Sequence, residues 1–117
     1  MGNFPKYQIK KSINNQFYWV LYAVNGKIIL PSSEQYISKQ GCQNGIASSK
    51  RSVADSNFKR LTAQNGQYYF LQRANNHEPL GRSEMYESSY ARDNGIDAVK
   101  RDAPIATVED TTVGSYV

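Results

Sequence analysis

The chain has 117 residues, the length of one globular domain, and its 39% hydrophobic and 12% aromatic content excludes a disordered or fibrous protein. A single cysteine excludes an internal disulfide, and no apolar run approaches the roughly 20 residues of a membrane span. The net charge of +4 is uneven, because residues 1–56 hold seven Lys or Arg against two acidic residues, whereas residues 57–117 hold seven against eight.

Runs of aromatic and β-branched residues predict strands, and the Asn and Gly pairs between them are typical of tight turns. In chain order the predicted strands are Tyr7–Lys11, Phe17–Ala23, Lys27–Leu30, Phe58–Thr62, Tyr68–Ala74, Pro79–Arg82 and Thr107–Thr112. One helix is predicted to open at Ser38 and another at Ser88. Serine is favoured there because its hydroxyl accepts a hydrogen bond from an unpaired amide of the first helical turn.

The two halves of the chain are copies of each other. Ser33–Arg51 matches Ser83–Arg101 at a constant offset of 50, with nine of the 19 positions identical. Upstream, Phe17–Trp19 matches Tyr68–Phe70 at an offset of 51, so one residue was gained or lost between the matching segments. Self-similarity at a fixed period indicates a duplication.

The repeat and the order of the elements predict the architecture. We expect the α+β class, as a tandem repeat of β-β-β-α units that forms one antiparallel sheet with two helices on one face. The C-terminal strand, at about 107–112, closes the sheet because it aligns with Phe58–Thr62. Residues 1–117 are expected to form a single domain built of two repeats, at about 7–56 and 58–106.

The two predicted helices share a pattern of small residues. They recur on one helix face at Gly41, Gly45, Ser48, Ala91, Gly95 and Ala98. Glycine inside a helix costs about 0.5–1 kcal/mol relative to alanine, so we expect the helix backbone to touch the sheet or the other helix there. The predicted core-facing line beside this stripe is Cys42, Ile46, Ser49, Val53, Ile96, Val99 and Ala103. Within it, Cys42 is interpreted as a small buried hydrophobic residue.

Several short motifs resemble a known family. They are Ala23–Gly26, Ser33–Lys39, Asn44–Ile46 and Ala98–Lys100. These segments resemble the YegP-like family, small and mostly bacterial proteins with one or two copies of a short domain. The resemblance extends over residues 7–112; it implies an α+β fold in which two tandem units build one sheet, and it implies no activity. This chain differs at Gln72, where a leucine is usual, and at Asn75–His77, which replaces an Asn-Gly turn.

Catalytic and metal-binding patterns are missing from the sequence. One histidine and one cysteine cannot supply the three or four ligands of a zinc site, and the carboxylates are too dispersed for a calcium loop. A Cys42–His77 pair would need the fold to join a helix and a turn that are distant in the chain. No nucleophile elbow or phosphate-binding loop occurs. We therefore expect no catalytic residue, metal or cofactor, and a protein that is not an enzyme.

Some polar residues are repeated in both copies: Glu34, Tyr36, Asn44, Glu84, Tyr86 and Asn94. A symmetric acid–base pair of Glu34 and Glu84 is one interpretation. The favoured one is structural, with each glutamate bound by the Lys-Arg pair at the far end of its helix or by a loop hydrogen bond. The asparagines are expected to bond a neighbouring loop, and the tyrosines to pack over the helix starts.

The strand Phe17–Ala23 and its copy have two faces, because side chains alternate along a strand. The row that contains Phe17, Trp19 and Leu21 is more apolar and is predicted to meet the helices. The opposite row is the candidate interaction surface, and its members are Tyr18, Val20, Tyr22, Tyr69, Leu71 and Arg73. Exposed aromatic patches often mark interaction sites.

Three functional hypotheses follow. The favoured one is an uncharacterised, non-catalytic protein-interaction module that binds an unknown protein partner, or itself, through this surface. The alternatives are single-stranded nucleic-acid binding through the same tyrosine-bearing surface with Lys10, Lys11 and Lys27, which the near-neutral second half disfavours, and small-ligand binding at the Glu34 and Glu84 loops. The first residues lack an apolar stretch of signal-peptide length, so a cytoplasmic location without a membrane partner is expected.

Overall fold

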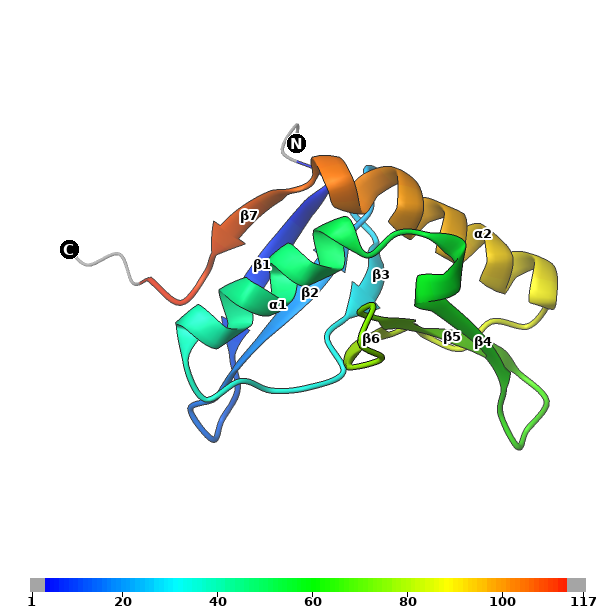
Figure 1. The fold of residues 1–117 in the computed structure, drawn as a ribbon, viewed down its shortest axis with the longest axis horizontal. Coiled ribbons are helices and arrows are strands. Elements are labelled where there is room, and N and C mark those ends of the chain that lie inside the picture. Colours follow the sequence, from blue (N-terminus) through cyan, green and yellow to red (C-terminus); the bar gives the residue numbers. More distant parts are fainter. Residues whose placement is uncertain (1–3, 114–117) are drawn as a thin grey trace.

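A computed structural model gives the fold and describes residues 4–113. The elements are β1 (Lys6–Lys11), β2 (Phe17–Tyr22), β3 (Ile28–Pro31), α1 (Lys39–Arg51), β4 (Phe58–Thr62), β5 (Tyr68–Arg73), β6 (Pro79–Arg82), α2 (Ser89–Asp102) and β7 (Thr107–Asp110). Short 3-10 turns at Asp55–Asn57 and Ala103–Ile105 follow the two helices (Figure 1). The predicted α+β class, the tandem repeat, the two helices and the final strand are confirmed.

The hairpin turns form where the sequence predicted them. The backbone has a positive φ at Asn15, Gly26 and Gly66, with values of 65°, 83° and 87°. His77 takes the same conformation, with a φ of 72°, at the turn between β5 and β6. Non-glycine residues adopt it rarely. At that turn the Asn76 side chain accepts a hydrogen bond from the Glu78 N–H (3.1 Å), which supports the tight chain reversal.

Both helices begin at the predicted serines. Ser38 Oγ accepts a hydrogen bond from the Gly41 N–H (2.9 Å), and Ser88 Oγ accepts one from the Ala91 N–H (3.0 Å). Each bond satisfies one of the amides that lack a partner in the first turn of a helix. The start of each helix is therefore fixed by local sequence alone.

The strands form two sheets, where a single one was expected. One sheet has the order β3-β2-β1-β7 and the other β4-β5-β6. The edge strands β3 and β6 meet at one isolated bridge, Ser32 with Gly81, beside a hydrogen bond from Ser33 N–H to Leu80 O (3.1 Å). Leu30 fills the space over Gly81, where a Cβ would lie 2.6 Å from Leu30 Cγ. Side-chain packing thus joins the sheets where the backbone ladder ends.

The last strand also differs from the expectation of an antiparallel sheet. β7 pairs with β1 in parallel register, with Lys6 beside Thr107 and Gln8 beside Glu109. A parallel pair needs a long crossover connection. The segment between β1 and β7 provides it, because the chain leaves α2 beside the start of β1. There the Thr107 N–H donates to Pro5 O (3.3 Å).

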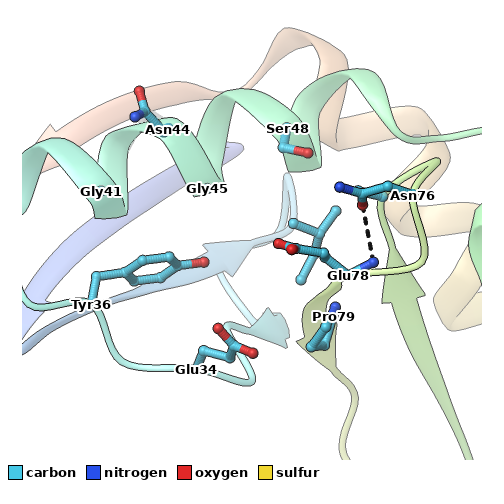
Figure 2. A pocket seen from close by; sticks show the side chains of 11 residues that line it. Glu34, Tyr36, Gly41, Asn44, Gly45, Ser48, Asn76, Glu78 and Pro79 are labelled. Atoms are coloured by element: carbon cyan, nitrogen blue, oxygen red, sulfur yellow. Dashed lines mark hydrogen bonds between the residues drawn. The ribbon is translucent and has the colours of Figure 1, made fainter.

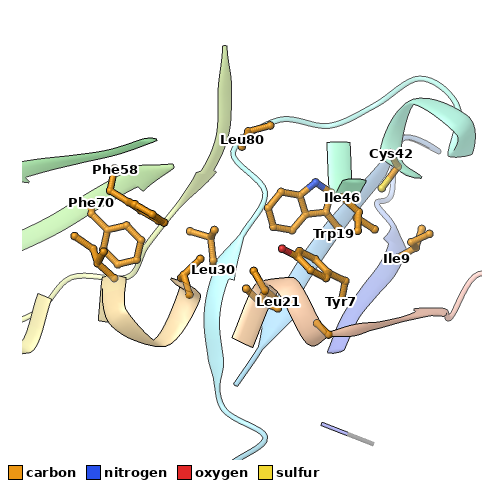
Figure 3. Close-up of a cluster of buried hydrophobic side chains, with 14 residues drawn as sticks. Tyr7, Ile9, Trp19, Leu21, Leu30, Cys42, Ile46, Phe58, Phe70 and Leu80 are labelled. Atoms are coloured by element: carbon orange, nitrogen blue, oxygen red, sulfur yellow. The ribbon is translucent and has the colours of Figure 1, made fainter. Parts of the chain in front are cut away.

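Each helix covers strands of both copies. α1 contacts β1 and β2 of its own copy and β6 of the other, and α2 contacts β5 of its own copy and β3 of the other. The predicted inward row is confirmed, since Trp19 and Leu21 are fully buried. Figure 3 shows Leu30 between side chains of the first copy and those of the second. The buried cluster consists of Tyr7, Ile9, Trp19, Leu21, Leu30, Cys42, Ile46, Phe58, Phe70, Leu80, Ile96, Val99, Ala103 and Ala106.

Gln72 connects the copies through a buried polar network. Its side chain is fully buried, and its amide nitrogen donates to Ser49 O (3.0 Å) and Ser52 O (2.8 Å) at the end of α1. Ser49 Oγ donates to Gln72 Oε1 (2.7 Å) and also bonds the Tyr7 hydroxyl (2.8 Å). Buried polar groups are costly unless paired, and here each of these groups has a partner.

The network predicts the effect of Gln72→Leu. The leucine leaves the Ser52 carbonyl without its donor, so we expect the free energy of unfolding to fall by about 1–3 kcal/mol. Urea denaturation measures this, with Gln43→Leu on the exposed side of α1 as the control and a change within about 0.5 kcal/mol expected there. Equal stability of Gln72→Leu and wild type would contradict a stabilising role for the network.

Candidate functional site

The side of the sheets that is turned away from the helices holds the six predicted interaction residues, and we call it the outward face. Residues in register lie on the same side of a sheet, so the buried Tyr7 and Ile9 place their neighbours Lys6, Gln8 and Lys10 outward. By this rule the outward face includes Lys6, Gln8, Lys10, Tyr18, Val20, Tyr22, Pro31, Lys59, Leu61, Tyr69, Leu71, Arg73, Arg82, Thr107 and Glu109.

The outward face is less open than the sequence suggested. Val20 is 5% exposed, because Pro31 pairs beside it and two tyrosines of the same row flank it, so it is not part of an accessible surface. The other five predicted residues are half-buried. Phe4 packs against Tyr22, with the ring centroids 5.8 Å apart. Tyr18 and Tyr69 are therefore the two tyrosines of this face without such an aromatic cover among the described residues.

Charged residues are segregated between the two sides of the sheets. On the helix side, ion pairs with aspartates hold Lys39, Arg60, Arg92, Lys100 and Arg101. The cations of the outward face are Lys6, Lys10, Lys59, Arg73 and Arg82. Lys6 pairs with Glu109 (2.9 Å), and the other four form no ion pair with any residue from 4 to 113. The outward face is thus strongly basic.

Two arginines of this face differ in their surroundings. Arg73 Nε is buried and has no hydrogen-bond acceptor among the residues described, which is uncommon for a buried polar atom. The Arg82 guanidinium stacks on Tyr69, with Cζ 4.8 Å from the ring centroid. Lys11, which the sequence grouped with Lys10, lies instead on the helix side, 5.2 Å from the Phe17 ring, because it continues the row of Tyr7.

A cleft of about 360 Å³ between the two copies is a second candidate site. Its volume falls within the range of small-ligand pockets, which often lie at such junctions. Figure 2 shows the side chains of Glu34, Tyr36 and Glu78 directed into the space between α1 and the turn that precedes β6. Asn44, Ser48 and Asn76 also line it.

Tyr36 forms one wall of this cleft because α1 has a glycine opposite its ring. A Cβ at Gly45 would lie 2.8 Å from Tyr36 Cζ and 3.2 Å from the Trp19 indole nitrogen. Burial raises the pKa of Tyr36, the nearby Trp19 offsets part of this rise, and Glu34 and Glu78 raise the pKa further. In the second copy Tyr86 packs on Gly95 in the same way. Two glycines of the small-residue stripe, Gly45 and Gly95, are therefore explained by tyrosine packing.

The structure does not bring Glu34 and Glu84 together. Glu34 lines the cleft with Glu78, whereas Glu84 lines a separate cavity of about 280 Å³ beside β3. The predicted salt bridges from Glu34 and Glu84 to the Lys-Arg pairs at the helix ends are also wrong. Lys50 instead donates a hydrogen bond to Ala106 O, and Lys100 pairs with Asp55. Ser32 and Ser83 bond the backbone oxygens of the two glutamate loops, which leaves the carboxylates free to face the cavities.

Three other residues that the sequence singled out, Asn44, Cys42 and His77, have different environments in the fold. Asn44 accepts a hydrogen bond from Gln40 Nε2 (3.1 Å) on its own helix, not from a neighbouring loop, because its side chain points along the exposed helix surface. Cys42 is fully buried, and burial together with Asp110 raises the pKa of its thiol to about 11. His77 lies in an exposed turn. Residues 4–113 contain no His, Cys, Asp and Glu cluster suited to a metal and no helix able to span a membrane.

Comparison with known proteins defines the class. The family described as "Domain of unknown function (DUF1508)" matches the chain twice, over residues 12–59 and 63–110. The chain therefore belongs to the DUF1508 family and carries two tandem copies of its domain.

Known relatives match this chain over nearly its whole length. A UPF0339 protein of Bordetella pertussis is 46% identical over 107 residues, which cover 91% of this chain and 96% of the relative. The UPF0339 protein YegP of Escherichia coli K12 is 41% identical over the same coverage. Solution NMR structures of YegP from E. coli and of a UPF0339 protein from Shewanella oneidensis superpose with TM-scores of 0.85 and 0.83, at 39% and 40% identity. The alignments cover 95% of both chains for YegP, and 90% of this chain and 89% of the other for the S. oneidensis protein. The family is uncharacterised.

The packing of Tyr36 on α1 predicts that Gly45→Ala destabilises the protein. The new Cβ displaces the tyrosine ring, and overpacking of this kind costs about 1–3 kcal/mol. At Gly41 the nearest atom to an added Cβ is Ser38 Oγ at 3.3 Å. Gly41→Ala serves as the same-helix control, because the higher helix propensity of alanine offsets this contact and little net change is expected. Thermal and urea unfolding measure both variants. An equal loss at the two positions would contradict the special role of Gly45.

Proposed function

We propose that the protein is a non-catalytic binding module of the cytoplasm and that its outward face binds an anionic polymer. The observation that supports this is the segregation of charge. Lys10, Lys59, Arg73 and Arg82 have no ion-pair partner among residues 4–113, while aspartates pair with five cations of the helix side, Lys39, Arg60, Arg92, Lys100 and Arg101. A surface of one sign attracts a partner of the other sign and accelerates its association.

The second half of the chain does not oppose this function. Its acidic excess lies on the loops before β6 and α2 and on β7, whereas α2 itself carries three acidic and three basic residues. The outward parts of β4, β5 and β6 contribute Lys59, Arg73 and Arg82. The near-neutral net charge of residues 57–117 thus conceals a basic surface.

Heparin affinity chromatography tests the anionic partner. We expect Lys59→Gln/Arg82→Gln to elute at a clearly lower salt concentration than wild type, because it removes two unpaired outward cations. Lys11→Gln/Arg51→Gln is the control, since it removes the same net charge from exposed residues outside the outward face. Equal elution of the two double variants would show that net charge alone governs binding and would overturn the assignment to this face.

The cleft supports a second candidate function, the binding of a small cationic group. Glu34 and Glu78 face this cleft, and neither forms an ion pair with any other residue of the described chain. A guanidinium or ammonium group would pair with both carboxylates, and the amide oxygen of Asn76, which lines the same cleft, would accept a remaining hydrogen.

Calorimetric titration with arginine amide tests the cleft. We expect wild type to bind this ligand and Glu34→Gln/Glu78→Gln to lose at least tenfold in affinity, because a charged hydrogen bond is about twice as strong as a neutral one. Glu87→Gln/Asp97→Asn is the control with the same net charge, and its two residues are exposed and do not line the cleft. Absence of wild-type binding would eliminate this candidate and leave the anionic surface untouched.

A further inference from the structure

We propose that the anionic polymer bound by the outward face is single-stranded nucleic acid, whose bases stack on Tyr18 and Tyr69 while its phosphates meet the neighbouring cations. This inference rests on the proposed function. It adds the aromatic component of the face, which a purely electrostatic partner would not need.

Aromatic rings and cations are adjacent on this face. Tyr18 is paired in register with Lys10, and the Arg82 guanidinium lies over the Tyr69 ring. Proteins that bind single strands combine a basic track for the backbone with aromatic side chains on which bases stack. An arginine plane stacked on an aromatic ring extends such a platform, because bases also stack on guanidinium groups.

The two platforms belong to different copies of the repeat. Tyr18 lies on β2 and Tyr69 lies on β5, the corresponding strand of the second copy. Beside Tyr69, the face offers apolar area at Leu71, and Lys59 and Arg82 pair with Leu71 in register, where they can meet phosphate oxygens. One extended strand therefore has a stacking site on each sheet and cations at both.

The same features disfavour the other polyanions. The bases of a duplex are stacked on one another, and its major groove admits a helix or a two-stranded ribbon, not the face of a wider sheet. An acidic polypeptide would use the cations but has no planar rings to stack on the tyrosines. The requirement for tyrosine therefore separates single-stranded nucleic acid from an acidic protein.

Fluorescence anisotropy with a labelled oligo(U) or oligo(dT) and the full chain tests the inference. We expect binding at low salt, a loss of about tenfold for Tyr18→Ser and for Tyr69→Ser, and near wild-type affinity for Tyr18→Phe and Tyr69→Phe, which keep the ring. Tyr90→Ser is the control, because Tyr90 is 76% exposed on α2. For Lys59→Gln/Arg82→Gln we expect the slope of log K against log salt to become shallower by about 1.4.

The remaining outcomes distinguish failure of the nucleic-acid inference from failure of the proposed anion-binding function. Equal affinity for polyglutamate, or for a duplex of the same length, combined with tyrosine variants that bind as wild type does, would overturn the nucleic-acid inference and leave an anion-binding face. Failure of every polyanion to bind at low salt would overturn both. A tyrosine-to-phenylalanine variant that binds as weakly as the serine variant would also overturn the stacking role. Circular dichroism and urea unfolding confirm that each variant is folded.

Discussion

The arrangement of the molecule depends on the contact between Leu30 and Gly81. The two sheets share one isolated bridge, so few backbone hydrogen bonds hold them together. Leu30 compensates by packing directly on the Gly81 backbone, where even a methyl group would lie 2.6 Å from its Cγ. This contact brings β3 and β6 close enough for α1 to reach over β6 and for α2 to reach over β3. Each copy then completes the apolar core of the other.

This exchange of helices determines where binding surfaces arise. Because both helices lie on one side, the opposite side of both sheets remains uncovered by helices and presents the outward face. Where α1 extends over β6 a cavity forms with Glu34 on its wall, and Glu84 lines a second cavity beside β3 to which α2 contributes no residue. The two glutamates of the repeat therefore lie in cavities of different construction. Glu78 and Asn76 line the first, whereas Ile28 and Ile29 line the second.

Features governed by nearby residues were predictable from the sequence, and features governed by distant contacts were not. The serine caps, the Asn-Gly turns and the inward row of Trp19 depend on local hydrogen bonds and alternation, and they are confirmed. The division into two sheets and the parallel pairing of β7 depend on where edge strands meet in space. No local pattern indicated that Glu34 would face Glu78, because the cleft joins segments from different copies. The two family matches, over residues 12–59 and 63–110, each end in the strand that follows a helix. By this division β7 belongs to the second unit.

The basic character of the outward face shows why the net charge of a segment is a poor guide to its surface. Lys59 and Arg60 are adjacent in β4, so their side chains point to opposite sides of the sheet. Arg60 meets Asp55 and Asp93 on the helix side, at 3.2 and 3.1 Å, and together with Lys100 it lowers the pKa of Asp55. Lys59 lies on the outward side, where no described acid pairs with it. The alternation thus places Arg60 in ion pairs on the helix side and leaves its neighbour Lys59 without a described ion-pair partner on the outward side. On β5 and β6 the outward positions carry Arg73 and Arg82, whereas the helix-side positions hold Phe70, Gln72 and Gly81, so this near-neutral segment presents positive charge on its outward side.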